Sequence, residues 1–325
     1  MYRYGTETTV RLINRRASAV GAAPVTAGVT VRRGTGAALL LMAPFFAVFA
    51  LAVLAPIGYA IYLSQFAQRA SGLGFGGLHS VWVGLDNYRR VLTDSTYTSS
   101  YLHVLLYAVV AVPLVLGLSV VIALALDSAY AFGRRAAQLG LFVPHLVPGV
   151  IAALIWAYLY TPQVSPVVKA LSSWHVHIEP LGPGFTYPSL INVVLWESLG
   201  YNIVIYYASL QAIPREMAEA AVVDGAGEWR TAWHIKLPLI RSAVALTAIF
   251  SAIGAMQLFA EPLLLSTAGS TGISQDWTPN LYAYTAAFTR NNDYGAAAAA
   301  SIILAALAAG LSYVVTRFGK PWRQA

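Results

Sequence analysis

The chain has 325 residues, of which 58% are hydrophobic and only 10% are charged, and it carries a formal net charge of +7. Soluble domains carry about 25% charged residues, so this composition excludes a chain that folds around one water-soluble core. The absence of cysteine excludes disulfides and thiolate metal sites. No basic patch is interleaved with aromatic residues, so no nucleic-acid partner is expected.

Long stretches without charge, taken in chain order, predict membrane-spanning helices. A helix needs about 20 apolar residues to cross a bilayer. Four uncharged stretches exceed that length, and two more are interrupted by one glutamate each, Glu197 and Glu261. The predicted fold class is therefore all-α, a polytopic membrane protein with six transmembrane helices. The spans are expected at about residues 35–63, 101–126, 138–160, 188–211, 242–267 and 294–316.

The segments outside the spans complete the predicted domain organisation. Residues 1–33 are expected to form a disordered cytoplasmic tail, residues 34–318 the six-helix transmembrane domain and residues 319–325 a second cytoplasmic tail. Within residues 64–100, a Gly-rich stretch precedes an amphipathic element (VWVGLDNYRRVLTD) that suits the outer membrane interface. The proline-rich connection at residues 161–187 is expected to be compact coil.

The distribution of basic residues predicts the orientation. With the N-terminus inside, fifteen of the twenty Lys and Arg residues fall in the tails and inner loops, and five fall outside. Cytoplasmic segments carry such an excess, so both termini are expected in the cytoplasm of a bacterial-type cell membrane. The basic net charge therefore reflects topology.

The connection between the fourth and fifth predicted spans, residues 212–241, is long and helix-forming. From Pro214 to Pro238 it reads PREMAEAAVVDGAGEWRTAWHIKLP and contains four of the thirteen acidic residues. Pro214 suits a helix start, the Ala and Glu run favours helix, and Gly225 can end it with a positive φ. We expect two short helices with a bend, either an amphipathic hairpin at the interface or a docking element for a cytoplasmic partner.

The same stretch matches a short signature: Glu219, Ala220 and Ala221, then Gly225, then Ile235, Leu237 and Pro238. This pattern resembles the EAA–G–I–LP signature of permease subunits of ABC importers, in the maltose and glycerol-phosphate transporter branch. VGLDNYRRVLTD, VPHLVPGVIAALIWAYLY and AYTAAFTRNNDYGAAAAAS resemble segments of the same family, so the similarity covers about residues 36–318. Ser242 and His103 stand where the family often has proline and asparagine, and the large outer domain of the best-known maltose permease is missing.

The resemblance implies a fold of the type I ABC importer kind and a transport subunit that is not an enzyme. It implies that residues 212–241 form a cytoplasmic coupling loop, whose helices sit in a cleft of a separate ATPase. The implied coupling residues are Glu216, Glu219, Ala220, Ala221, Asp224, Gly225, Ala226, Ile235, Leu237 and Pro238. No residue of this chain is expected to be catalytic.

The resemblance also implies several partners within the lipid bilayer and at its two surfaces. These are a second, homologous permease subunit, two ABC ATPase subunits and an extracytoplasmic solute-binding protein. The chain has no P-loop, because Gly319 and Lys320 lack an upstream glycine at the required spacing. ATP and Mg are therefore expected to be used by the partner ATPase, and no cofactor is expected on this chain.

Polar and aromatic side chains inside the predicted spans are candidates for a substrate path. A carboxylate inside a membrane is costly and is by default a functional candidate, although Glu261 could equally form a structural pair near the outer end of its span. Sugars are bound by carboxylates, amides and aromatic faces, but aromatic belts and helix contacts use the same residue types. The candidates are Trp156, Tyr160, Glu197, Asn202, Tyr206, Gln257 and Glu261.

The remaining alternatives concern metal binding and the class of transporter. No metal site is expected, because His103 and His145 have no second ligand at helical spacing, and His175 and His177 lie in an expected exposed loop. A sugar or oligosaccharide is the expected substrate class, with glycerol phosphate or a polyol as the alternative. A phosphate would favour Lys or Arg in the path, and the spans contain none. A secondary transporter would need no ATPase, and an intramembrane enzyme would need a catalytic cluster that the spans lack.

Overall fold

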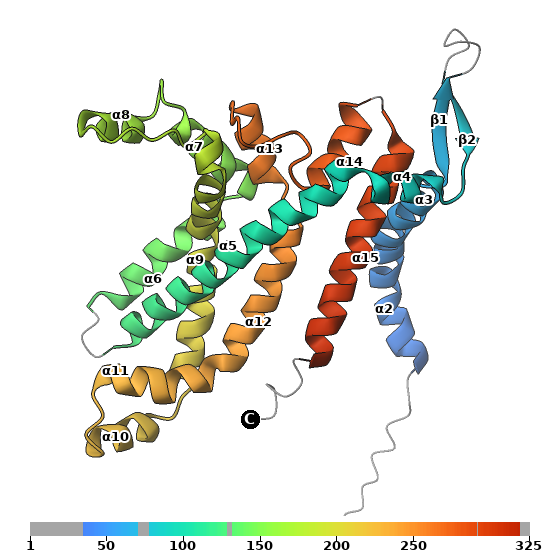
Figure 1. The fold of residues 1–325 in the computed structure, drawn as a ribbon. Helices are drawn as coiled ribbons and strands as arrows, with labels where there is room; N and C mark the ends of the chain where they lie inside the picture. The colour runs from blue at the N-terminus through green and yellow to red at the C-terminus, as the bar shows by residue number, and fades with distance from the viewer. Residues whose placement is uncertain (1–34, 71–77, 129–131, 291, 319–325) are drawn as a thin grey trace, which may run out of the picture. The chain divides into compact units, whose positions relative to one another are not determined.

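The computed structural model describes residues 35–70, 78–128, 132–290 and 292–318 (Figure 1). The tails predicted at residues 1–33 and 319–325 lie outside the described residues. The chain divides into two compact units, Met1–Ala55 and Pro56–Ala325, which are described in turn.

The described part of the first unit is helical. It consists of α2 (Thr35–Phe49) and a π-helical segment, η1 (Ala50–Leu54). Large apolar side chains are exposed along it, with Leu41 82% and Leu51 77% accessible, as suits a lipid-facing helix. With α3 (Ala55–Leu63) the segment provides a candidate membrane span of 25 residues, Leu39–Leu63, where the first span was predicted.

The second unit is built from helices and one two-stranded sheet. Its further elements are β1 (Phe66–Ala70), β2 (Leu78–Trp82), α4 (Asp86–Thr93), α5 (Ser95–Asp127), α6 (Arg134–Phe142), η3 (Val143–Leu146), α7 (Gly149–Tyr160), α8 (Pro166–Ser173), η4 (Pro183–Phe185), α9 (Thr186–Gln211), α10 (Arg215–Val223), α11 (Glu228–Thr231), η5 (Ala232–Lys236), α12 (Leu237–Met256), α13 (Ala260–Thr267), α14 (Pro279–Phe288) and α15 (Tyr294–Phe318).

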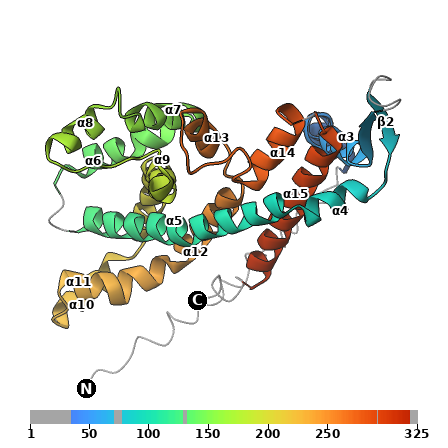
Figure 2. The same cartoon turned by 45° about the horizontal axis from the view of Figure 1, so that its top comes forward.

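The 33-residue helix α5 organises the second unit, as both ribbon views show (Figures 1 and 2). It packs along α9 and also contacts α12 and α14. The fully buried Leu190 and Leu281 lie with Tyr107 of α5 in one apolar cluster, and Tyr206 and Ile240 lie in a second cluster with the C-terminal half of α5. Burial of these side chains fixes the helices around the site described below.

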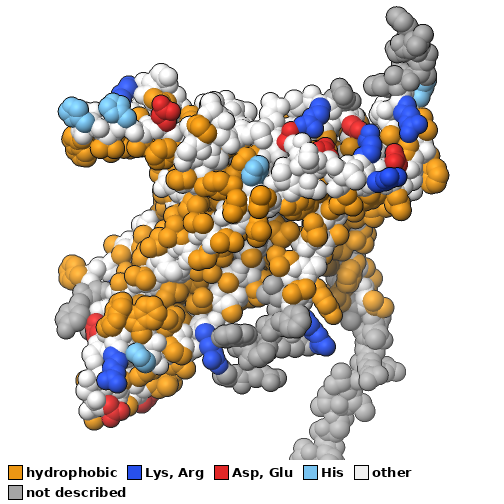
Figure 3. All heavy atoms as spheres, viewed as in Figure 1, with side chains coloured by type: hydrophobic (Ala, Val, Ile, Leu, Met, Phe, Trp, Pro, Cys, Tyr) orange, Lys and Arg blue, Asp and Glu red, His pale blue; other side chains and the backbone are white. Residues whose placement is uncertain are grey.

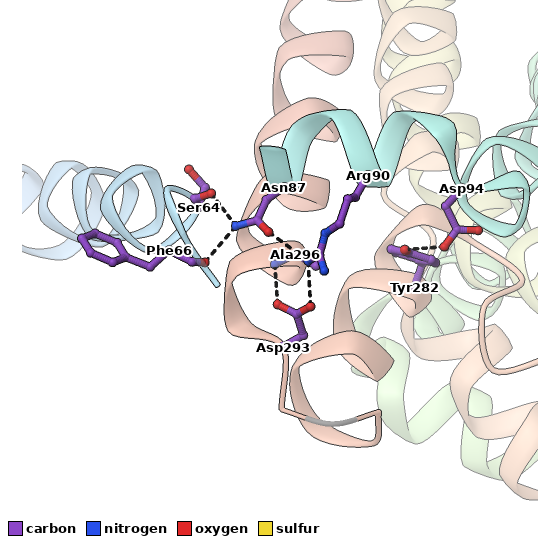
Figure 4. A network of polar contacts seen from close by, with 8 residues as sticks. All are labelled: Ser64, Phe66, Asn87, Arg90, Asp94, Tyr282, Asp293 and Ala296. Carbon is purple, nitrogen blue, oxygen red and sulfur yellow. Dashed lines mark hydrogen bonds and ion pairs between the residues drawn. The ribbon is translucent and has the colours of Figure 1, made fainter. Parts of the chain in front are cut away.

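A polar network holds the start of this helical assembly (Figure 4). Asn87 of α4 is fully buried, and its Nδ2 donates to the carbonyl oxygens of Ser64 and Phe66 at 2.8 Å each. Arg90 donates to Asn87 Oδ1 at 2.9 Å and forms an ion pair of 2.9 Å with Asp293, which precedes α15. The network therefore joins α4 to the end of α3 and the start of α15.

Asp94 extends this network to α5 and α14. Its side chain caps α5 by accepting from the backbone N–H of Thr96 at 2.8 Å, and it accepts from the Tyr282 hydroxyl at 2.7 Å. Burial alone would raise the pKa of the Asp94 carboxyl, but these hydrogen bonds outweigh burial and lower the pKa below its ordinary value. The charged carboxylate is thus the form that the fold favours.

The segment predicted as the third span, residues 138–160, differs from a straight helix. The pair formed by α6 with η3 and by α7 is bent by 95°. Val147 and Pro148 between them are extended, with ψ of 125° and 135°. Pro148 has no N–H to donate and disfavours helical geometry at Val147, so the helix breaks there.

The segment predicted as the fifth span, residues 242–267, is also divided. Helix α12 ends at Met256, and α13 begins at Ala260. In a continuous helix, the ring of Pro262 would clash with the carbonyl of Leu258, so the chain turns before α13. In the other direction α12 continues from α11 and η5, so that the candidate span is Glu228–Met256.

The number of spans remains a prediction. By length and composition, four described helices can cross a membrane, or five if the bent pair is one span. Helix α9 occupies the fourth predicted span, residues 188–211, but carries Glu197 and Asn202 and is not among these four.

Two further features differ from the sequence-based expectation. Strand β1 pairs antiparallel with β2, from Phe66 opposite Trp82 to Ala70 opposite Leu78, so the class is not strictly all-α. Hairpin loops usually have two to five residues, and the seven residues that connect these strands exceed that length, so the sequence did not predict the hairpin. Helix α8 forms within the predicted coil, because Pro166 suits its first position and Ser165 Oγ accepts from the Val168 N–H.

Candidate functional site

The segment predicted to couple to a partner forms two short helices, as its composition indicates. Pro214 precedes α10, whose end is closed by bonds from Gly225 N–H to the Val222 carbonyl at 3.0 Å and from Ala226 N–H to the Ala221 carbonyl at 2.9 Å. Gly225 has a φ of +79°. A Cβ there would meet nothing within 4 Å, so the backbone conformation, rather than space, requires glycine.

Most of the predicted coupling residues lie on an exposed surface of the second unit. Ala221 is 6% accessible and anchors α10, whereas Val222 and Val223 are 68% and 87% accessible. The exposed predicted residues are Glu216, Glu219, Ala220, Asp224, Gly225 and Pro238, and the half-buried ones are Ala226, Ile235 and Leu237. Exposed valines therefore lie beside acidic side chains on α10.

The second half of the segment runs directly into α12. In the π-helical η5, the Leu237 N–H bonds to the Ala232 carbonyl five residues earlier. Pro238 follows at once, and its ring does not fit a regular α-helical turn, so the wider turn accommodates it. Elements α11, η5 and α12 are therefore continuous and form the candidate span Glu228–Met256.

Asp127, at the end of α5, ties this segment to the helical assembly. Its carboxylate accepts from Gln211 Nε2 at 2.6 Å and from Lys236 Nζ at 2.5 Å. Ser128 donates to Glu228 Oε2 at 2.7 Å. The side chains of Asp127 and Lys236 are only 12% and 22% accessible, so this ion pair is shielded from solvent. We refer to Asp127, Gln211 and Lys236 as the Asp127 clamp.

A cavity of about 310 Å³ lies between α5, η3, α9, α12 and the start of α13. Four of the seven candidate path residues line it: Glu197, Asn202, Gln257 and Glu261. The two breaks described above, near Pro148 and after Met256, bring the polar side chains of separate elements to this one cavity.

The two glutamates converge at the start of α7. A Cβ placed on Gly149 would lie 3.1 Å from Glu197 Oε1 and 3.6 Å from Glu261 Oε1. The N-terminus of a helix carries a partial positive charge, which favours carboxylates nearby. Glycine at this position therefore lets both carboxylates approach the backbone and line the cavity.

Amide groups and hydroxyls complete the polar lining. Asn202 is 3% accessible; its Nδ2 donates to the Ser198 carbonyl at 2.9 Å, while its Oδ1 is buried without a hydrogen-bond partner. Gln257, beyond the end of α12, also lines a second groove of about 670 Å³ between α14 and α15. These groups can donate to and accept from a hydroxylated ligand.

Three candidate path residues do not line this cavity. Tyr206 is fully buried, and its hydroxyl lies 2.5 Å from Thr247 Oγ1, joining α9 to α12. The Tyr160 hydroxyl donates to the Ser189 carbonyl at 3.1 Å and accepts from Asn192 Nδ2 at 2.8 Å. These tyrosines hold helices together.

Trp156, the third of these residues, packs among aromatic rings, tilted against Tyr160 and edge-on to Trp196. Its ring centroid lies 5.4 Å from that of Tyr160 and 6.1 Å from that of Trp196. Its Nε1 is buried and has no hydrogen-bond partner. The ring of Trp156 packs against the apolar core cluster that lies beside the cavity.

Several cavity residues were not predicted. His145, considered above only as a possible metal ligand, lines the cavity, with Nδ1 3.0 Å from the Glu197 carbonyl and its ring 5.0 Å from Tyr201. Tyr107 and Ser251 also line it. The two prolines around His145 are the signal that could have drawn attention to it, since an irregular segment exposes side chains that a straight helix would pack.

Comparison with known proteins gives consistent relatives. The family model described as "Binding-protein-dependent transport system inner membrane component" matches residues 95–323. The sn-glycerol-3-phosphate transport system permease protein UgpA of Yersinia pseudotuberculosis serotype I (strain IP32953) is 29% identical over 283 residues, covering 86% of this chain and 92% of UgpA. The diacetylchitobiose uptake system permease protein NgcF of Streptomyces coelicolor (strain ATCC BAA-471 / A3(2) / M145) is 30% identical over 287 residues, covering 83% and 79%.

A solved structure has a similar fold. A chain of a bacterial ABC transporter involved in the import of the acidic polysaccharide alginate superposes with a TM-score of 0.75 and 21% identity, covering 87% of this chain and 95% of that chain. The bacterial alginate ABC transporter in complex with an alginate pentasaccharide-bound periplasmic protein gives a TM-score of 0.73 at 20% identity, covering 90% and 95%.

Proposed function

The chain belongs to the binding-protein-dependent transport system inner membrane component family, and from this premise we propose that it forms half of the translocation pathway for a sugar or oligosaccharide. It is a multi-pass bacterial membrane protein, a permease of the ABC importer class for carbohydrates and not an enzyme. The proposal adds that the pathway includes the cavity lined by Glu197 and Glu261, and that a homologous permease supplies the other half.

The polar lining of the cavity carries the substrate proposal. Two carboxylates and two amides provide acceptors and donors for hydroxyl groups, and Tyr107 and Tyr201 provide aromatic surface. The names of the two relatives given above refer to sn-glycerol-3-phosphate transport and to diacetylchitobiose uptake. Among the described residues, no Lys or Arg lines this cavity to bind a phosphate. This favours a neutral sugar over glycerol phosphate; a polyol remains the closest alternative.

The coupling proposal follows from the exposed α10–η5 segment. We infer that a separate ATPase subunit, present twice in the transporter and using ATP and Mg, covers α10 on the cytoplasmic side. Its closure would push α11 and η5, and the continuous α12 would carry this movement to the cavity. A ligand-driven change requires different contacts in two states, which a docked and rigidly connected helix pair can provide. The predicted six spans and cytoplasmic termini belong to the same proposal, as does delivery of substrate by an extracytoplasmic binding protein.

Reconstitution tests this function. The chain, co-expressed with the permease, ATPase and binding protein encoded beside it, should take up a labelled sugar into vesicles only when ATP is present. Glu197→Gln and Glu261→Gln should each raise the KM for uptake by about ten- to a hundredfold, since a buried hydroxyl contact is lost. Glu179→Gln, at an exposed position away from the cavity, is the matched control. Uptake driven by an ion gradient without the ATPase would contradict the proposal.

Topology can be tested independently, because the chain lacks cysteine. A single cysteine at Ala226 should react with a membrane-impermeant thiol reagent only in inside-out vesicles. A single cysteine at Ser173, at the end of α8, should react only from outside. External labelling at position 226 would overturn the orientation and the coupling proposal together.

A further inference from the structure

A second hollow, which the transport proposal does not use, lies where α11 and η5 cross the end of α5. It has a volume of about 370 Å³. One wall is formed by Val121 and Leu124 of α5, and the other by Trp229 and Trp233. We call it the α5–α11 groove. Figure 3 shows hydrophobic side chains gathered over this end of the molecule, with charged side chains beside them.

The apolar wall of the groove continues the membrane-facing surface of α5. Along that helix, Leu114, Leu118 and Val121 are 39%, 39% and 52% accessible, and the helix is long and apolar enough to cross a bilayer. At membrane depth, such exposed side chains contact acyl chains wherever no other subunit covers them. The groove therefore continues an apolar strip that lies at membrane depth.

The two indoles are placed as membrane-interface anchors. Trp229 and Trp233 are one helical turn apart, with ring centroids 5.6 Å apart, and they are 74% and 44% accessible. Tryptophan is enriched at the level of lipid headgroups, because its ring is apolar and its N–H is polar. The groove thus combines an acyl-chain surface with side chains suited to the glycerol level of a lipid.

The polar rim carries one positive and one negative group. Lys236 Nζ donates to Asp127 but has three donors, so it can also bind a phosphate. Glu228 accepts from Ser128 through Oε2, and a carboxylate can accept further bonds, including from an ammonium group. A headgroup with a phosphate and an amine complements this pair, whereas a headgroup with only negative charge would be repelled by Glu228.

We propose that the α5–α11 groove binds a zwitterionic amine-bearing phospholipid of the phosphatidylethanolamine class, with its phosphate at Lys236 and its ammonium at Glu228. The bound lipid braces α11 against α5 and so stiffens the connection from the coupling segment to α12. The location in the cytoplasmic leaflet and this consequence for coupling rest on the proposed function. The binding itself rests only on the groove and on the membrane location of α5.

Lipid retention tests the proposal on the purified transporter complex, without ATP or substrate. The complex is delipidated, incubated with nanodiscs containing brominated phosphatidylethanolamine or brominated phosphatidylglycerol, and followed by tryptophan quenching and native mass spectrometry. Wild type should retain phosphatidylethanolamine about tenfold better than phosphatidylglycerol. Trp233→Ala should abolish retention, and Glu228→Gln should remove the preference between the two lipids while leaving binding. Trp82→Ala, an exposed tryptophan on β2 at the other end of α5, is the control.

Three outcomes would overturn the proposal. They are equal retention of both lipids by wild type, retention that Trp233→Ala does not change, and a cross-link from position 229 to the ATPase that excludes lipid from the groove. The last result would show that a protein partner covers the groove. Because no step of the assay involves transport, a failure of uptake leaves the lipid result standing, and loss of lipid binding leaves the transport assignment standing.

Discussion

The two ends of helix α5 are held in different ways. At its start, Asp94 is bonded to Thr96 and Tyr282, and the buried Tyr97 hydroxyl donates to the Ala300 carbonyl at 2.8 Å. At its other end, Asp127 joins Gln211 and Lys236, but beyond this clamp Val222, Val223 and the acidic side chains of α10 lie exposed. At the start of α5, these polar side chains are hydrogen-bonded within the chain. Beyond its other end, the side chains of α10 are exposed.

This difference suits a rigid frame at the start of α5 and, in the proposed function, a segment at its other end that moves. A network of saturated, buried hydrogen bonds rigidifies the elements that it joins. A segment with few buried apolar contacts is held less firmly, and α10 buries only Ala221. We therefore expect substitutions at the start of α5 to affect stability, and substitutions in the α10–η5 segment to affect transport at nearly constant stability.

The largest effect is expected from Gly225→Asp. A side chain at φ +79° is strained by about 1–2 kcal/mol, and the bend that presents α10 is lost. We expect ATP-dependent uptake to fall by about a thousandfold, equivalent to about 4 kcal/mol, at an unchanged amount of protein in the membrane. Gly269→Asp is the control, since Gly269 also has a positive φ, +98°, but lies after α13. Asp224→Lys should reproduce the loss without backbone strain; normal uptake by both loop variants would refute the coupling role.

Asn87→Ala tests the frame. It would leave the carbonyl groups of Ser64 and Phe66 without the hydrogen bonds that the buried amide provides. Because an unsatisfied buried group costs about 1–3 kcal/mol, we expect a loss of about 3 kcal/mol in the free energy of unfolding. Thermal unfolding in detergent measures it. The neighbouring, exposed Arg89→Ala should change stability by less than about 0.5 kcal/mol.

The Asp127 clamp connects the frame to the α10–η5 segment. We expect its variants to have a smaller effect than Gly225→Asp or Asn87→Ala. Asp127→Lys or Lys236→Asp alone leaves like charges together in a shielded position, and uptake per ATP hydrolysed should fall by about tenfold, or about 1.4 kcal/mol. The double exchange should recover most of the coupling, because Gln211 can turn its amide oxygen toward the new lysine. A double variant as poor as the single ones would show that the ion pair does not position the loop.

The smallest effect is expected from Asp293→Asn. The asparagine keeps the cap on the Ala296 N–H, at 3.0 Å, and loses only the ion pair with Arg90, whose side chain is 50% accessible. Exposed pairs contribute about 0.2–1 kcal/mol and are screened by salt. The difference in melting temperature from wild type should therefore be small and should disappear at high ionic strength. A large, salt-independent loss would mean that Asp293 is part of the buried frame.

The coupling segment was predictable in detail from local sequence. Helix-forming residues after Pro214, glycine at the bend and proline at the start of α12 act over a few residues, so their consequences follow without knowledge of the remaining fold. The exposure of Glu219 and Asp224 likewise follows from a segment that lacks apolar partners within its own length. The role of these residues in coupling stays a prediction.

The cavity was predictable only in part. Glu197 and Glu261 were identified because carboxylates are rare in membrane helices. Tyr206 and Tyr160 belong to equally plausible residue types, yet their partners, Thr247 and Ser189, turn them into helix contacts. No local pattern distinguishes a tyrosine that lines a cavity from one that joins two helices.

The sequence by itself determined the class of this protein, because apolar length, the scarcity of charge and the placement of basic residues report on the membrane as a solvent. It also determined the two short helices and the bend within residues 212–241, because capping and turn preferences act locally. Only the tertiary structure decided where the helices at Pro148 and Met256 break, and that Glu197 and Glu261 meet beside Gly149. Proline permits a break without choosing its angle, and the packing of α5 against α9 and α12 selects which side chains then share one cavity.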